Sequence, residues 1–258
     1  MNISSKRINF LADRFNARSY LEIGVHKGDT FLNVAIKNRF AVDPAFKFEY
    51  RHLESDSCHF FPVASDLFFE SLKSGSFNNI PPDIKFDLIF IDGLHIYENA
   101  FRDFINSILF SHTNTIWIID DTIPSDPYSS IPDNALSYQY RARAGLIDRP
   151  WHGDVYKCIF ALHDFYMDFS YATIYDSGNP QTVVWKTNWN AQRKRIFDNI
   201  NSIGQLNYFD ILRYTNVFNL STDKNLPSLI GERFDTSAIS RDEALRILIK
   251  PLRVSARS

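Results

Sequence analysis

The sequence predicts an α/β protein built on a doubly wound, mostly parallel sheet, and three observations support that fold class. Short apolar runs alternate with amphipathic segments after an N-terminal helical pattern. Most of these runs are apolar along their whole length, as strands covered on both faces must be. A turn with two glycines follows the first run, in "SYLEIGVHKGDTF". Such a strand-to-helix turn lets backbone approach a ligand closely.

Composition limits the classes of protein that fit. The chain has 258 residues, is 45% hydrophobic and contains 23 phenylalanines, so we expect one large globular domain with additions. A net charge of −2 without a Lys/Arg block argues against a nucleic-acid or anionic-membrane partner. No leader-like N-terminus and no apolar run long enough to span a membrane occur, and we expect a cytoplasmic protein. Cys58 and Cys158 lie too far apart for a zinc motif, although a single disulfide stays open.

The elements follow in order along the chain. Ile8, Leu11 and Phe15 recur at helical spacing and predict an N-terminal helix, and a second helix is expected to open at Thr30. Five apolar runs are expected to be strands: residues 20–24, 40–43, 60–64, 86–91 and 115–119.

The clearest helical pattern follows "IDGLH". Its apolar residues fall at helical spacing and predict a helix packed on the core. They are Tyr97, Ala100, Phe101, Phe104, Ile105, Ile108 and Leu109. The polar residues expected on the other face are Glu98, Arg102, Asp103 and Asn106.

The pattern changes after the fifth strand. Residues 121–150 contain four prolines and form a connection long enough to be a functional lid or a small inserted helix. The residues at its centre could cover a sugar or an acidic substrate, or form a solvated helix face: Tyr138, Tyr140, Arg141 and Arg143. "GDVYKCIFALHDFY" predicts a helix with Asp154 near its N-cap, and "YATIYDSGNPQTVVW" predicts two strands joined by a turn.

The first motif with chemical meaning is Glu22-x-Gly24-x-x-x-Gly28, which differs from the G-x-G-x-x-G of nicotinamide and flavin enzymes. Asp43 ends the second expected strand, where an acid can accept hydrogen bonds from ribose hydroxyls. Taken singly, these residues would be a solvated acid, turn glycines and the start of an Asp-Pro turn. Together, in this order and spacing, they predict a cofactor site.

On these residues the chain resembles the class I S-adenosylmethionine-dependent methyltransferases, whose first strand carries an acid-x-Gly-x-x-x-Gly motif and whose second strand ends in an acid. The segments "ASDLFF", "FDLIFIDGLHIYENAFRDF", "IIDDTIP" and "WHGDVYK" are similar to those of bacterial small-molecule and glycan O-methyltransferases. The resemblance implies a Rossmann-like, seven-stranded sheet with a terminal antiparallel hairpin. It also implies a methyltransferase domain over residues 1–186 and a mainly helical extension over 187–258.

The resemblance implies a set of cofactor contacts. Glu22, Gly24 and Gly28 would shape the pocket for the amino-acid end of S-adenosylmethionine, and Asp43 would bind its ribose. The remaining contacts implied are Ser65 and Asp66 near the adenine, and Asp92.

"IDGLH" ends the fourth strand and brings Asp92 and His95 to the edge of the sheet where ligands bind. Methyl transfer to a hydroxyl needs removal of a proton, and His95, with an ordinary pKa of about 6.5, is a suitable general base. The alternative is a histidine at a helix start that is satisfied by backbone contacts. Asp92 and His95 are the expected catalytic pair.

Asp120 and Asp121 follow the fifth strand at the same edge. With Asp92 they would provide three carboxylates able to hold Mg²⁺, as in the metal-dependent O-methyltransferases that this set resembles. Many metal-free relatives carry Asp-x-x-Pro there instead, which Asp121-Thr-Ile-Pro124 also matches. In that case the aspartates would cap turns and contact the cofactor's amino group.

The sequence thus predicts an S-adenosylmethionine-dependent methyltransferase acting on a hydroxyl of a small molecule or a sugar or glycan precursor, with S-adenosylmethionine and, in one alternative, Mg²⁺ as cofactors. Two other classes stay open. A nicotinamide oxidoreductase fits Asp43 but lacks the third glycine at the required spacing, and a catalytically silent cofactor-binding module has no sequence feature against it. Homo-oligomerisation stays open as well.

Overall fold

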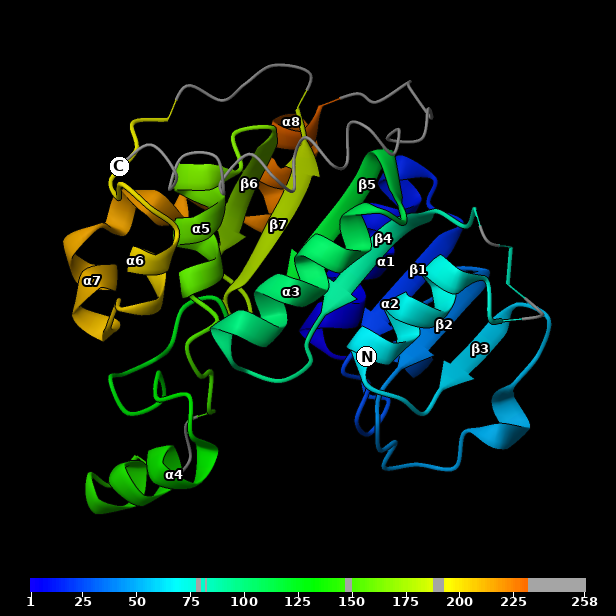
Figure 1. Ribbon diagram of the computed structural model, residues 1–258, viewed down its shortest axis with the longest axis horizontal. Coiled ribbons are helices and arrows are strands. Elements are labelled where there is room, and N and C mark those ends of the chain that lie inside the picture. The colour runs from blue at the N-terminus through cyan, green and yellow to red at the C-terminus, as the bar shows by residue number, and fades with distance from the viewer. Residues whose placement is uncertain (78–79, 82, 147–149, 188–192, 232–258) are drawn as a thin grey trace.

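The computed structural model of the protein describes residues 1–77, 80–81, 83–146, 150–187 and 193–231, and in this part of the chain it has one eight-stranded sheet (Figure 1). The strand order is β3-β2-β1-β4-β5-β7-β6-β8. The strands are β1 (Ser19–Ile23), β2 (Asn38–Val42), β3 (Cys58–Phe61), β4 (Phe86–Ile91), β5 (Ser111–Ile119), β6 (Phe169–Ile174), β7 (Gln181–Lys186) and β8 (Leu220–Ser221).

The sheet is doubly wound, as predicted. Strands β1 to β5 run parallel, and the chain turns from one side of β1 to the other between β3 and β4. Strand β7 is antiparallel to both β5 and β6, which confirms the terminal hairpin. The predicted count of seven strands is wrong by one, because Leu220 and Ser221 pair in parallel with Thr173 and Ile174 of β6. This short strand covers a sheet edge that would otherwise be open.

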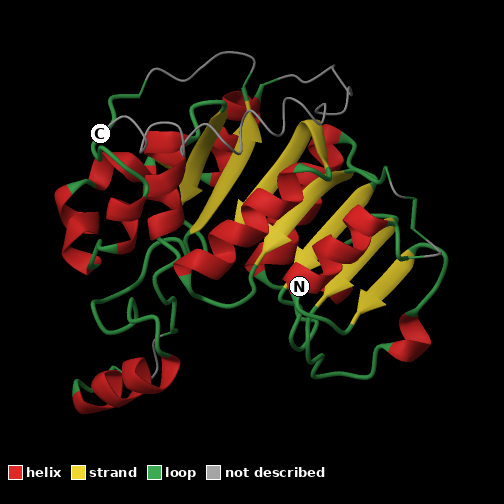
Figure 2. Ribbon diagram, in the orientation of Figure 1, coloured by secondary structure: helices red, strands yellow, loops and turns green. Residues whose placement is uncertain are grey.

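Helices cover both faces of the sheet (Figure 2). The helices are α1 (Ile3–Phe15), α2 (Ser65–Ser74), α3 (Tyr97–Ile108), α4 (Asn134–Arg143), α5 (Lys157–Phe165), α6 (Asn201–Gly204), α7 (Tyr208–Arg213) and α8 (Leu226–Ile230). Helices α2, α3 and α5 pack on one face in a core that contains Phe68, Phe104 and Phe160. Helices α1 and α8 pack on the other face, where Ile8 and Leu226 are fully buried.

The helix expected from Thr30 is reduced to a single 3₁₀ turn over Phe31–Asn33. The chain leaves it in extended form, burying Val34 and Ile36, and β2 already begins at Asn38. The connection is therefore too short for a helix, and α1 covers this face of the sheet instead.

The predicted stripe of α3 is confirmed, but one residue assigned to its polar face is not exposed. Asp103 is only 4% exposed. Asp154 lies near the N-cap of α5, as predicted, but its side chain does not cap that helix. Asp154 accepts the N–H of Tyr97 at 2.7 Å and pairs with Lys157 at 2.9 Å, so it holds the start of α3 rather than capping α5.

The long connection after β5 contains α4, the small inserted helix that the sequence allowed, and α4 extends beyond the carboxyl edge of the sheet (Figure 1). The C-terminal addition packs beside α5, where Lys157 Nζ donates to the carbonyl of Gly204 over 2.9 Å. Within residues 193–231 this addition contains the short helices α6, α7 and α8 and the strand β8, whereas residues 188–192 and 232–258 lie outside the described part. Both cysteines are free and buried. No helix in the described ranges combines the length and apolarity needed to cross a membrane.

Candidate active site

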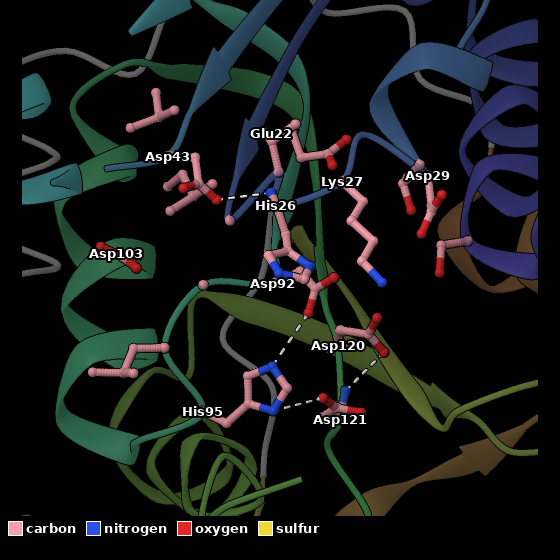
Figure 3. A pocket seen from close by; sticks show the side chains of 18 of the residues that line it. Glu22, His26, Lys27, Asp29, Asp43, Asp92, His95, Asp103, Asp120 and Asp121 are labelled. Atoms are coloured by element: carbon pink, nitrogen blue, oxygen red, sulfur yellow. Dashed lines mark hydrogen bonds and ion pairs between the residues drawn. The ribbon is translucent and has the colours of Figure 1, made fainter. Parts of the chain in front are cut away.

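A cavity of about 930 Å³ lies at the carboxyl ends of the central strands. Its walls come from the turn after β1, the ends of β2, β4 and β5, the start of α2, the β6–β7 hairpin and the segment around Trp151 (Figure 3). This is the edge at which open α/β sheets bind ligands. Small-molecule sites span roughly 300–1,000 Å³, so there is room for a cofactor together with an acceptor.

Gly24 brings the turn after β1 against the end of β4. Its φ of +87° lies in the left-handed region, and a Cβ there would overlap the backbone carbonyl of Asp92. Gly24 is therefore required by the contact between two strand ends and lines the cavity as a result. Gly28, with φ of +79°, shapes the same turn but is not among the described lining residues.

Asp43 ties the same turn to the end of β2. Its Oδ2 accepts the N–H of His26 at 2.8 Å, and its Oδ1 accepts the N–H of Ala45 at 2.7 Å. His26 adopts a positive φ of 47°, which turns its N–H toward this carboxylate. Each carboxylate oxygen can accept a second hydrogen bond, so Asp43 lines the cavity with capacity left for a ligand hydroxyl.

Glu22 lies at the bottom of the cavity and is 1% exposed. Its Oε2 accepts the hydroxyl of Tyr20 at 2.5 Å. Burial raises the pKa of Glu22 well above its ordinary value, and the hydrogen bond from Tyr20 offsets this only in part. A cationic ligand group in the cavity would favour the ionised carboxylate.

The structure separates the two residues expected near the adenine. Ser65 lines the cavity, whereas Asp66 is half-buried, pairs with Arg102 at 2.8 Å and is not among the described lining residues. Asp103 also lines the cavity, where burial raises its pKa to about 7 and the neighbouring Ser65 side chain offsets this rise in part. The place of Asp103 in the cavity could not be predicted, because helical spacing cannot distinguish a polar residue that faces a cavity from one that faces water.

The cavity also contains a cluster of Asp92, His95 and Asp121. One ligand atom from each lies within 4.8 Å of the others. His95 lies between the two acids, with Nε2 3.6 Å from Asp92 Oδ1 and Nδ1 3.0 Å from Asp121 Oδ2 (Figure 3). The two residues predicted to be catalytic are thus brought together, and Asp121 joins them.

The segment "WHGD" holds His95 in place. The Trp151 ring stacks on the His95 ring with centroids 4.9 Å apart, and the Trp151 carbonyl lies 3.1 Å from His95 Nδ1. Gly153 has φ of +60°, and a Cβ there would overlap the carbonyl of His95. The contact between Trp151 and His95 could not be predicted from the sequence, because nothing local encodes it.

Electrostatics couple the cluster. Burial, together with the charge of Asp120, raises the pKa of Asp92 to about 7. Burial would lower the pKa of His95, but the nearby Asp92 and Asp121 outweigh it and raise this pKa to about 9. Without ligands, His95 therefore carries a proton at neutral pH. It can act as a base only after a cation offsets the charge of its two carboxylate neighbours.

The two aspartates after β5 point differently. Asp120 Oδ1 accepts the N–H of Asp121 at 2.8 Å, and Asp120 lies beside the three-residue cluster rather than in it. Asp121 adopts a positive φ of 58° and accepts Asn179 Nδ2 at 2.9 Å. Burial, followed by the charge of Asp121, raises the pKa of Asp120 to about 7, and burial raises that of Asp121 to about 7.

A second histidine, His152, also lies close to Asp121. His152 is 2% exposed, and its Nε2 lies 3.7 Å from Asp121 Oδ1 while its Nδ1 lies 3.2 Å from the hydroxyl of Ser129. Burial lowers the pKa of His152 to about 4, so this ring is neutral. By contrast, Tyr138 and Tyr140 are exposed on α4 and are not among the described lining residues.

The donor set of the cluster fits a divalent cation. The two carboxylates are ligands that Mg²⁺ and Mn²⁺ accept, whereas the imidazole nitrogen is a ligand more typical of Zn²⁺ and Fe²⁺. The set differs from the expected Asp92, Asp120 and Asp121 in one member, because His95 stands where Asp120 was expected.

No family model and no curated protein matches the chain. Among solved structures, the chain is similar to an O-methyltransferase from Bacillus cereus in complex with SAH, with 16% identity over 70% of this chain and 80% of that one, and a TM-score of 0.50. An O-methyltransferase from Streptomyces achromogenes in complex with SAM matches at 18% identity. The match covers 71% of this chain and 79% of that one, with a TM-score of 0.41. At 16% identity the likeness to the Bacillus cereus structure establishes the fold alone, a Rossmann-like α/β fold that this chain shares with that O-methyltransferase.

Proposed function

We propose that the protein is an S-adenosylmethionine-dependent methyltransferase (EC 2.1.1.-) that acts in the cytoplasm on a hydroxyl of a small molecule or a sugar or glycan precursor. One observation carries the proposal. A single cavity of about 930 Å³ has Asp43 at the end of β2 and the Asp92–His95–Asp121 cluster at the ends of β4 and β5, so that a ribose contact and a proton acceptor share one space. The fold supports this reading.

The cofactor contacts follow from the places of these residues. Asp43 would accept the ribose hydroxyls, and Ser65 with Asp103 would meet the adenine. Glu22 and Asp92 are acids beside the glycine turn and suit the amino group and sulfonium of the cofactor, whose positive charge would favour their ionised forms. Gly28 would act through the shape of the turn, and Asp66 is the weakest of the expected contacts because it is paired with Arg102.

His95 is the proposed general base and Asp92 its partner. Methyl transfer is an in-line displacement, in which the acceptor oxygen must reach the methyl carbon as its proton leaves. The proton would pass to His95, whose ring is fixed by Trp151 and flanked by Asp92 and Asp121. This requires neutral His95, and positive charge brought by the cofactor or a cation would lower its pKa toward the ordinary value.

A divalent cation is the second part of the proposal. Asp92 and Asp121 would hold it, with His95 or Asp120 as a further ligand. When bound, the cation supplies Lewis-acid polarisation of the acceptor hydroxyl. If His95 is a ligand it cannot also be the base, and so the two roles compete in a measurable way.

The acceptor side of the cavity suits a polyhydroxylated ring. Trp151 offers an aromatic surface, and Asn134 and Asn179 offer amide donors and acceptors. Residues 1–186 would form the methyltransferase unit, and residues 187–258 its C-terminal extension.

The test is turnover. Purified protein is incubated with S-adenosylmethionine and a panel of methyl glycosides, free sugars and catechol, and S-adenosylhomocysteine is measured by mass spectrometry. We expect S-adenosylhomocysteine to form with at least one hydroxyl acceptor. Binding of S-adenosylmethionine without turnover on any acceptor would favour the silent cofactor-binding module. Binding of NAD in place of S-adenosylmethionine would favour the oxidoreductase.

A further inference from the structure

The β6–β7 hairpin carries two side-chain amides that hold the two adjacent aspartates after β5. Asn179 Nδ2 donates to Asp121 Oδ1 over 2.9 Å. Gln181 stands opposite Asp120, one step beyond the antiparallel pair of Ile119 and Thr182, and its side-chain amide offsets part of the rise in the pKa of Asp120. Each of the two buried carboxylates therefore has its own amide partner from one short segment, "NPQ".

The backbone continues the same contact. Strands β5 and β7 are antiparallel with Ile119 opposite Thr182, and this register brings Asp120 toward Gln181. Beyond it, the N–H and the hydroxyl of Thr122 donate to the carbonyl of Pro180 over 3.1 and 3.2 Å. Three successive residues after β5 are thus joined to three successive residues at the start of β7.

The side chain of Gln181 is held by Arg7 and Ser4. It is 1% exposed, its Oε1 accepts Arg7 Nη1, and its Nε2 donates to the hydroxyl of Ser4 over 2.8 Å. Because arginine can only donate, the amide oxygen must face Arg7 and the amide N–H groups must face Ser4 and Asp120. The orientation that serves Asp120 is therefore set by Arg7.

Arg7 is held in turn by the C-terminal addition. It is 3% exposed and pairs with Asp223 through two parallel contacts, Nε to Oδ1 at 2.6 Å and Nη2 to Oδ2 at 2.9 Å. Nη2 also donates to the hydroxyl of Ser177 over 2.7 Å. A continuous chain of contacts thus leads from Asp223 to the cavity.

We propose that Asn179 and Gln181 are positioning residues for Asp121 and Asp120, and that Arg7 with Asp223 locks Gln181, so that the C-terminal addition takes part in organising the active site. This inference rests on the proposed function, in which Asp121 holds a divalent cation and Asp120 can be a further ligand. Adjacent buried carboxylates repel one another, and a fixed donor on each holds a single orientation that a cofactor or acceptor can use.

Gln181→Glu separates positioning from stability. The glutamate has nearly the volume of glutamine and offers Arg7 a full carboxylate, but it cannot donate to Asp120. We expect a folded protein, because the Arg7 guanidinium pairs with the new carboxylate, and an affinity for S-adenosylmethionine within about twofold of wild type. We expect kcat to fall at least tenfold. The matched control is the same glutamine-to-glutamate change at an exposed position, Gln205→Glu, which should leave kcat unchanged.

The link to the C-terminal addition has its own variant. Asp223→Asn removes the charge that fixes Arg7 and should lower kcat severalfold, whereas Asp176→Asn on the exposed tip of the same hairpin should not. Combined with Gln181→Met, Asp223→Asn should add little further loss, because both act through one chain of contacts.

A stable Gln181→Glu protein with wild-type kcat would overturn the inference. Failure of the proposed function would look different, since wild-type protein would then bind no S-adenosylmethionine in a calorimeter. If wild-type protein methylates no acceptor in the panel, the link between Asp223 and Gln181 is tested by melting temperature instead. The losses in the two single variants are then compared with the loss in the double variant. Additive losses for Asp223→Asn and Gln181→Met would overturn it, and a double loss clearly smaller than the sum would support it.

Discussion

His95 Nδ1 lies 3.0 Å from Asp121 Oδ2, although one residue follows β4 and the other follows β5. The contact is held from both sides, by the Trp151 ring stacked on His95 and by the Asn179 amide on Asp121. It places an imidazole against a buried carboxylate at the edge of the sheet where the cofactor turn also lies. The proposed chemistry depends on this pair.

Replacing His95 by alanine tests the base directly. If His95 takes the acceptor proton, kcat should fall by about 10²–10⁴-fold, the usual contribution of a general base. The affinity for S-adenosylmethionine, measured by calorimetry, should stay within a few-fold of wild type. The exposed His52, changed to alanine, is the matched control. Wild-type turnover in His95→Ala at neutral pH would pass the role to another group.

Removal of metal distinguishes the two catalytic alternatives. If Asp92 and Asp121 hold a cation, treatment with a chelator should abolish turnover, and Mg²⁺ or Mn²⁺ should restore it. Asp121→Asn should raise the concentration of cation needed, by about 10-fold or more, because one charged ligand is lost. The control Asp13→Asn, at an exposed position on α1, should leave the required concentration of cation unchanged. Full activity after exhaustive chelation would leave His95 as the base and the aspartates as cofactor contacts.

Gly24→Ala should weaken cofactor binding at least tenfold. A methyl group at this position would overlap the Asp92 carbonyl, and alanine is strained at φ of +87°. We expect at least a tenfold loss of affinity for S-adenosylmethionine, which corresponds to about 1.4 kcal/mol. Gly75→Ala is the matched control, because Gly75 also has a positive φ of +67° but open space around it. Equal affinity in both variants would contradict the assigned role of the turn.

The ligand-free protein should lose stability as pH rises. Burial raises the pKa values of Asp92, Asp103, Asp120 and Asp121 to about 7, against about 3.9 in an unfolded chain. The folded chain then binds more protons than the unfolded one between pH ~4 and pH ~7, and the free energy of unfolding falls across that range. The pKa of His95 is raised to about 9, and so the free energy of unfolding continues to fall from pH ~6.5 toward pH ~9.

Urea unfolding at pH 5 and pH 8 measures this effect. We expect the free energy of unfolding to be lower at pH 8 by at least about 1 kcal/mol, roughly the value of one pKa unit in a single group. Asp103→Asn, which removes one of the buried acids, should reduce the difference. Equal or greater stability at pH 8 would show that these carboxyls ionise freely in the folded protein.

Much of the site could be predicted because parallel strands end at one edge. Once the runs ending at Val42, Ile91 and Ile119 are taken as parallel strands, the acids that directly follow them must lie at the same edge of the sheet. The helix expected at Thr30 was a local signal that the short distance to β2 overrode. The eighth strand has two residues, too few for any periodicity to show.

The missing parts of the site depend on contacts between distant segments. Trp151 reaches His95 only through the path of a long connection, and Gln181 reaches Asp120 only through the register of β7 against β5. Asp103 stands at a position that helical spacing alone assigns to water. No local pattern encodes such contacts, because each is decided by where the intervening chain runs.

Calorimetric titration of the purified protein with S-adenosylmethionine, S-adenosylhomocysteine and NAD tests the central claim most directly. We expect one site per chain for S-adenosylmethionine and S-adenosylhomocysteine, no heat with NAD, and weakened binding in Gly24→Ala but not in Gly75→Ala. Binding of NAD, or the absence of binding by both S-adenosyl compounds to folded wild-type protein, would contradict it.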